Sequence, residues 1–264
     1  MSRFHARTSA LTAQQDRRLR SGLDAAHERA RLVLTALPQV GIPEGRLERI
    51  DQSLFIPLAT LMHNDSFKAP ELFRFIFEMG RPESLKRHLG SMAREAVPNY
   101  KGFVLEAYVR WCLERLAKSE EHSSFTFISP GKGVLPSGRE YEVNQWGNVL
   151  FFDPNRRRGR VQIAEIDCMC EFYHSGHFAP VMFEASFRDH PLHYRWKSRL
   201  VGELYRSHSD PYVCEVLASW GAHGAVIEPG SVNPLKRKII IPNSPEFEAV
   251  AERLYKRDLA FPDL

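Results

Sequence analysis

Apolar side chains recur with a helical period through the first part of the chain. From Ser9 to Leu37 they return every three or four positions, and Pro38 ends the pattern. Residues 43–62 predict a second helix with a kink at Pro57, because proline lacks the N–H that continues a helix and its ring crowds the preceding turn. We therefore expect this part of the chain to consist of amphipathic helices.

Shorter helical segments follow up to residue 98. They are expected at about 69–79, where Pro70 suits a first turn, and at 82–96. Val97-Pro98-Asn99 interrupts the pattern, so we expect residues 1–98 to form an all-helical N-terminal region. The next helix, over residues 101–118, carries a single apolar stripe made of Leu105, Tyr108, Cys112 and Leu116.

From residue 124 onward the apolar pattern is that of strands. Strands are expected at 125–128, 141–143, 149–152, 212–218, 225–228 and 238–241, with a loop at 129–133 and a basic turn at 153–160. Helices are expected at 192–206 and 245–257. Residues 99–264 therefore predict an α/β domain.

Two further predicted strands carry acids among apolar residues. In Ala164–Cys170, Glu165 and Asp167 share one face, and in Pro180–Ser186 the acid is Glu184. The short connection between the strands lets them pair as an antiparallel hairpin, which brings Asp167 close to Glu184. Like charges buried together require a metal ion or a raised pKa.

A third acid, Glu106, lies on the helix of residues 101–118. Gly102, Phe103 and Val109 flank it at helical spacing, so we expect its carboxylate to be partly buried. The alternative is an ordinary surface ion pair with Arg110, four residues later.

The order of these elements resembles that of the PD-(D/E)xK nuclease superfamily. A helix with Glu106, a strand with Asp167, a hairpin and a strand with Glu184 correspond to its helix acid, metal-binding strand and (D/E)xK strand. The resemblance runs from Gly102 to about Ile241, within roughly the last 160 residues of the chain. It implies a restriction-endonuclease-like mixed central sheet flanked by helices, following the helical N-terminal region.

The sequence departs from the family pattern at Ser186, where the family has lysine. That lysine positions the attacking water and offsets charge on the scissile phosphate, which a serine cannot do. In some members the lysine has migrated to a neighbouring element. Lys197, on the following helix, is our candidate for this role, and Arg188 is a poorer one because it stays charged near pH 7.

The chemistry that the resemblance implies is metal-assisted hydrolysis of nucleic-acid phosphodiester bonds, with DNA as the first substrate to test. Asp167 and Glu184 would hold Mg²⁺ or Mn²⁺, and Glu106 would complete the metal's ligands directly or through water. The alternative is a catalytically inactive subunit of this fold that binds nucleic acid or a partner protein.

Basic residues near the acidic strands are candidates for contacts with the nucleic-acid backbone. They form two runs, on the predicted turn and at the start of the last strand: Arg156, Arg157, Arg158 and Arg160, then Lys236, Arg237 and Lys238. The alternative is that these runs are solvated surface.

The sequence gives weaker support for a zinc site and for a phosphate-binding loop. Cys168, Cys170, His174 and His177 have a spacing that could suggest zinc, but both cysteines fall on the presumed core face of a strand. Residues 129–133 lack the spacing of a phosphate-binding loop. A third possibility for the whole chain is an α/β interaction domain with structural acids.

Composition restricts the possible partners and cellular location of the protein. The formal charge of +4 permits contact with nucleic acid without requiring it, and the four cysteines form no framework, so we expect reduced thiols. No apolar run reaches the ~18–20 residues of a membrane span, and the first forty residues are polar. We expect a soluble cytoplasmic protein. Its N-terminal helices are candidates for recognising a nucleic-acid sequence, for forming a homodimer or for binding a partner protein.

Overall fold

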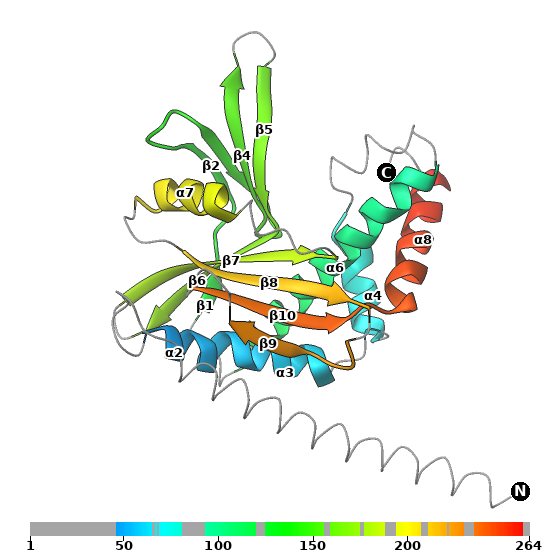
Figure 1. Cartoon of the computed structure of the whole chain (residues 1–264). Helices are drawn as coiled ribbons and strands as arrows, with labels where there is room; N and C mark the ends of the chain where they lie inside the picture. Colours follow the sequence, from blue (N-terminus) through cyan, green and yellow to red (C-terminus); the bar gives the residue numbers. More distant parts are fainter. Residues whose placement is uncertain are drawn as a thin grey trace, which may run out of the picture. The chain divides into compact units, whose positions relative to one another are not determined.

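A mixed six-stranded β-sheet organises the part of the chain that the computed structural model describes. Its strand order is β1-β6-β7-β8-β10-β9 (Figure 1). The residues described belong to the unit Gly45–Leu264 and are 46–64, 67, 69–80, 93–119, 125–155, 159–174, 177–187, 194–206, 211–220, 222–229 and 235–260. The helix predicted over Ser9–Leu37 lies outside them.

Antiparallel pairing on one side of this sheet gives way to parallel pairing in its centre. β1 (Phe125–Phe127), β6 (Cys168–His174) and β7 (His177–Ser186) are successive antiparallel neighbours, so the predicted hairpin is confirmed. β8 (Tyr212–Ser219) runs parallel to β7 and to β10 (Lys236–Pro242), and β9 (Val226–Pro229) closes the edge antiparallel to β10.

A second, four-stranded antiparallel sheet is inserted in the chain between β1 and β6. Its strands are β2 (Gly131–Val134), β3 (Glu140–Val143), β4 (Val149–Asn155) and β5 (Gly159–Ile166), and β4 and β5 extend away from the larger sheet (Figure 1). The predicted hairpin of β3 and β4 is confirmed. The loop predicted at 129–133 is partly wrong, because β2 pairs along β3 and its backbone hydrogen bonds override the low strand propensity of Gly131 and Gly133.

The single strand predicted over Ala164–Cys170 is instead two strands in different sheets. β5 ends at Ile166, β6 begins at Cys168, and Asp167 is the residue between them. We call this point the sheet junction. Asp167 therefore lies at the point where the chain passes from one sheet to the other. The pattern of apolar and polar residues does not reveal this break.

The helix predicted at residues 43–62 is present with a wider turn in its middle. α2 (Arg46–Ile50) leads into a π-helical segment, η1 (Asp51–Phe55), and then into α3 (Ile56–Asn64). The N–H of Ile56 donates to the carbonyl of Asp51, five residues back. This wider turn directly precedes Pro57, whose ring crowds a regular α-helical turn.

The predicted helix break at residues 97–99 is wrong. α4 (Pro70–Glu78) has Pro70 in its first turn as expected, but α6 (Ala93–Ala117) continues through Pro98. The proline removes one hydrogen bond close to the start of α6, and the long buried face beyond it, including Tyr100 and Val104, compensates for that loss. Residue 98, where the sequence predicts a domain boundary, therefore lies inside a helix.

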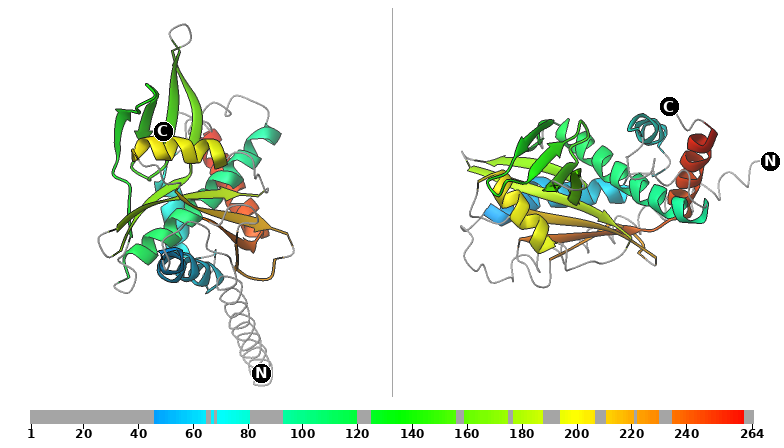
Figure 2. Two further views of the ribbon diagram at one scale, coloured as in Figure 1. Left: turned by 60° about the vertical axis from the view of Figure 1, so that its left-hand side comes forward. Right: turned by 90° about the horizontal axis from the view of Figure 1, so that it is seen from above.

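Helices cover both faces of the six-stranded sheet. α3 and α6 pack on one face (Figure 2). On this face Phe55 of η1 contacts Phe183 of β7 edge to face. α7 (Tyr194–Leu204) lies over the opposite face, with Leu200 and Val201 in a shared core with Met182 and Val213. α8 (Pro245–Ala260) packs along α6. No helix in the described ranges has both the length and the apolar character to cross a membrane.

A buried ion pair joins the helical segment of residues 46–64 to the sheet. The guanidinium of Arg237 on β10 donates to both carboxylate oxygens of Asp51 at 2.8 and 2.7 Å, and Arg237 is only 1% exposed. Burial raises the pKa of Asp51 to about 6, although the charge and hydrogen bonds of Arg237 act to lower it. The helical segment made of α2, η1 and α3 is thereby held on β10.

Removing one partner of this pair should destabilise the protein strongly. Arg237→Met leaves the Asp51 carboxylate buried without its partner, and we expect a loss of about 3–5 kcal/mol in the free energy of unfolding, measured with urea at pH 7. Asp51→Leu combined with Arg237→Met should recover part of that loss. Arg74→Met, which removes the exposed pair between Arg74 and Glu78, is the control and should change little. Equal effects of Arg237→Met and Arg74→Met would contradict this account.

Candidate functional site

Asp167 is tied to β7 by the backbone. Its Oδ2 accepts a hydrogen bond from the N–H of Ala185 at 2.7 Å. Ala185 directly follows Glu184, so the contact places the carboxylate of the sheet junction beside the acid of β7. The close approach of Asp167 and Glu184 that the sequence predicts is therefore present.

Glu184 is almost enclosed and has one oxygen without a hydrogen-bond partner. The residue is 7% exposed, and its Oε2 lies 2.5 Å from Nζ of Lys197 on α7. Its Oε1 is buried and accepts no hydrogen bond. A buried carboxylate oxygen without a partner loses its hydration, which costs free energy unless a donor or a cation replaces the water.

Two more carboxylates complete what we call the acidic cluster: Glu106, Glu165, Asp167 and Glu184. Glu106 reaches it from α6, and Glu165 comes from β5, two residues before Asp167. Each lies within electrostatic range of the others and of Lys197. The structure thus brings together the four residues predicted as catalytic and adds Glu165, which the strand pattern places next to Asp167.

The pKa values in the acidic cluster reflect its burial and its excess of negative charge. Burial, and then the charges of its acidic neighbours, raise the pKa of Glu106 well above the usual value. Burial likewise raises the pKa of Asp167 to about 6, against the lowering effect of Lys197. Burial and the charge of Asp167 raise the pKa of Glu184 well above normal. Burial acts to lower the pKa of Lys197, but the carboxylates outweigh it and the pKa rises.

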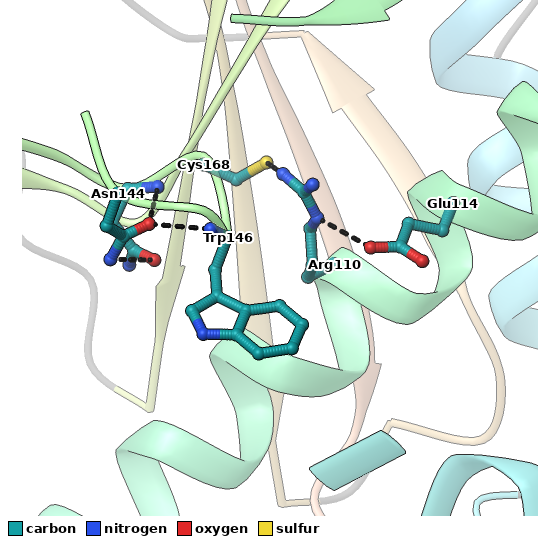
Figure 3. A network of polar contacts seen from close by, with 6 residues as sticks. Arg110, Glu114, Asn144, Trp146 and Cys168 are labelled. Atoms are coloured by element: carbon teal, nitrogen blue, oxygen red, sulfur yellow. Dashed lines mark hydrogen bonds and ion pairs between the residues drawn. The ribbon is translucent and has the colours of Figure 1, made fainter. Parts of the chain in front are cut away.

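The side chain of Arg110 on α6 contacts Glu114 and Cys168 (Figure 3). It lies one helical turn after Glu106, donates to Oε1 of Glu114 at 3.1 Å and contacts Sγ of Cys168, the residue after Asp167, at 3.6 Å. Its guanidinium also lies 3.4 Å from the ring centroid of Phe127. α6, β1 and the start of β6 are therefore held together, which sets how Glu106 faces the sheet junction.

The turn between β3 and β4 packs against the same arginine. Gly147 has a φ of +78°, and a Cβ at this position would lie 2.3 Å from Nη1 of Arg110. Its carbonyl accepts the N–H of Met169 at 3.1 Å. Asn144 closes the turn by accepting the N–H groups of Trp146 and Asn148 (Figure 3). The four-stranded sheet is thus anchored beside the cluster.

A further buried acid, Glu215, was missed by the sequence analysis. It lies on β8 in register with Glu184 of β7, is fully enclosed, and has Nζ of Lys236 2.7 Å from its Oε2. Glu215 is the only charged residue in the strand predicted at 212–218. An acid in the middle of an apolar strand is the sequence signal that could have identified it.

Among the described basic residues predicted to contact phosphates, Arg160, Lys236 and Arg237 are paired with acids. Arg156, Arg157 and Arg158 lie outside the described residues. The prediction is wrong for Arg237, because its guanidinium is buried against Asp51. Lys236 is paired with Glu215, and Lys238 is half-buried on β10.

Arg160 is the most accessible of the described members of this set. It is exposed on β5 and pairs with Glu140 and Glu142, both at 3.1 Å. Its guanidinium also covers the ring of Phe152. A phosphate would have to compete with two carboxylates for it.

The chemistry of the acidic cluster suits a hard divalent cation better than zinc. Carboxylate oxygens are the ligands that Mg²⁺ and Mn²⁺ prefer, and the unpartnered Oε1 of Glu184 is available as one. Cys168 and Cys170 are buried free thiols, as expected. Within the described ranges no three His, Cys, Asp or Glu side chains are already arranged to hold a metal ion.

Comparison with models of known protein families, with curated proteins and with solved structures finds no match for this chain.

The raised pKa values predict how stability depends on pH in the absence of metal. A carboxyl whose folded pKa lies above its unfolded value, about 3.9 for Asp, binds more protons in the folded state, so stability falls as pH rises between the two values. For Asp167 this window runs from about 4 to about 6. We expect Tm, measured in EDTA, to fall less steeply with rising pH in Asp167→Asn than in the parent protein.

Asp153→Asn is the matched control, because Asp153 is exposed on β4. It should keep the pH dependence of the parent. A slope unchanged by Asp167→Asn would show that the carboxyl of Asp167 does not carry a raised pKa.

Proposed function

We propose that this protein is a divalent-metal-dependent nuclease, with DNA as its first substrate, and that its α/β domain has a restriction-endonuclease-like fold. The observation that carries the proposal is the convergence of Glu106, Asp167 and Glu184 around a buried carboxylate oxygen that lacks a partner. Burying these acids together is costly unless a cation offsets their charge.

The order of the elements supports the same proposal. α6 with Glu106 precedes an antiparallel set of β1, β6 and β7, which is followed by α7 and the parallel strand β8. This is the arrangement that the resemblance to the PD-(D/E)xK superfamily implies, with the four-stranded sheet as an insertion before the metal-binding strand.

Lys197 supports a catalytic role for the site despite Ser186. Its ammonium approaches Glu184 from α7, and Glu184 and Ser186 share a face of β7. Lys197 thus supplies, from a neighbouring element, the positive charge that the family pattern places two residues after the glutamate. Next to a scissile phosphate it would offset the negative charge that develops during hydrolysis.

The chain's own residues have distinct tasks in this proposal. Asp167 and Glu184 would hold Mg²⁺ or Mn²⁺, and Glu106 would orient a ligand water or bind directly. The bound ion would supply an activated water and charge stabilisation. The hydrogen bond from Ala185 fixes Asp167, and the contacts of Arg110 fix the helix that carries Glu106.

The test is cleavage of plasmid DNA, single-stranded DNA and RNA with Mg²⁺ and with Mn²⁺. Glu184→Gln keeps the size of the side chain and removes its charge, so we expect the cleavage rate to fall at least about hundredfold. Glu171→Gln, on β6, is the control. The carboxylate of Glu171 accepts hydrogen bonds from the hydroxyls of Tyr205 and Tyr173 and is not part of the acidic cluster. Cleavage that survives Glu184→Gln unchanged would rule out this site.

Ser186 favours a second candidate function, that of a non-catalytic subunit which binds nucleic acid. This candidate predicts salt-sensitive binding with no turnover under either metal ion. Metal-dependent cleavage by the parent protein that Lys197→Met abolishes would exclude it.

A further inference from the structure

Lys197 occupies the position of a counter-ion in the acidic cluster. Its Nζ is paired with Oε2 of Glu184, and only 19% of the Lys197 side chain is exposed. Asp167 and Glu165 also act on its charge. Lys197 therefore balances part of the negative charge that a divalent cation would balance in the proposed enzyme.

The neighbouring cations are held by other partners. Arg110 is bound to Glu114 and Cys168, and Lys236 is bound to Glu215 on the adjacent strand. Two lysines thus pair with two acids that lie side by side, Glu184 and Glu215, and the charges of Asp167 and Glu165 also act on Lys197.

We propose that Lys197 and the divalent cation compete for Glu184, so that metal loading displaces Lys197 from this carboxylate and frees its ammonium for the phosphate of the substrate. This inference rests on the proposed function, because it assigns a regulation to the same site. The lysine would be available for catalysis only once the metal ion is in place.

Electrostatics gives the reason for the exchange. A doubly charged ion shared by Asp167 and Glu184 repels an ammonium that is in contact with Glu184, and the repulsion is strong where water is scarce. Before loading, the same ammonium lowers the negative potential of the cluster, so it opposes binding of the ion.

The side chain can move without moving its helix. Leu200 and Val201 of α7 are fully buried in the core with Met182 and Val213, which fixes the helix on the sheet. The flexible four-carbon stem of lysine lets Nζ leave Glu184 while the backbone stays in place. The exchange therefore needs only a change of side-chain rotamer.

The experiment measures Mn²⁺ affinity by isothermal titration calorimetry at pH 8, without nucleic acid. Lys197→Met removes the competitor, and we expect the Kd for Mn²⁺ to fall about tenfold. Lys197→Gln removes the charge but keeps a hydrogen-bond donor, so it should also bind more tightly and it covers the case in which the methionine variant does not fold. Lys197→Arg keeps the charge and should stay close to the parent.

Lys236→Met is the matched control, because it removes the lysine paired with Glu215 on the adjacent strand. Its Kd for Mn²⁺ should change little. A Kd that is unchanged or higher in both Lys197→Met and Lys197→Gln would overturn the competition.

Cleavage assays on the same proteins separate this inference from the proposed function. Cleavage by the parent protein together with unchanged Mn²⁺ affinity in the lysine variants would uphold the nuclease and overturn the competition. Tighter Mn²⁺ binding in these variants, with no cleavage by the parent, would uphold the competition and reject the nuclease.

Discussion

The gathering of four carboxylates beside the ammonium of Lys197 is the constraint on which the candidate site depends. The charges of Glu106, Glu165, Asp167 and Glu184 act on one another, and Lys197 is paired with Glu184. Burial together with mutual repulsion raises the pKa of Glu106 and of Glu184. A protein keeps such an arrangement at a cost in stability, and a site that binds a cation is a physical reason to keep it.

The architecture creates this constraint at the sheet junction. Because β5 belongs to one sheet and β6 to the other, Asp167 is free of regular strand pairing and its side chain turns to the N–H of Ala185. Arg110 on α6 donates a hydrogen bond to Cys168, the residue that follows Asp167. The buried pair of Arg237 and Asp51 joins the helical segment of residues 46–64 to β10 of the same sheet. Contacts made by residues outside the acidic cluster therefore fix the positions of its acids.

Much of the site could be predicted from the sequence because acids stand out in apolar strands. Asp167 and Glu184 were found in this way, and the helical neighbours of Glu106 indicated its burial. Lys197 was found from the absence of a lysine at Ser186. Glu215 is likewise an acid in an apolar strand, β8, but it corresponds to no residue of the PD-(D/E)xK pattern.

What the sequence could not give depends on contacts between distant residues. The break at Asp167 follows from membership of two sheets, and alternation along one strand carries no sign of it. Pro98 reads as a helix end, yet the buried face of α6 overrides it. Arg237 lies in a basic run that resembles a phosphate-binding surface, and only its partner Asp51, 186 positions away, reveals that it is buried.

The most direct measurement is anomalous diffraction from crystals soaked in Mn²⁺ at a pH where the carboxyls are ionised. The convergence of acidic side chains around a cation predicts a single strong anomalous peak in contact with Asp167 and Glu184, with Glu106 beside it. An ordered cluster that shows no peak at saturating Mn²⁺, with Lys197 still paired to Glu184, would contradict it.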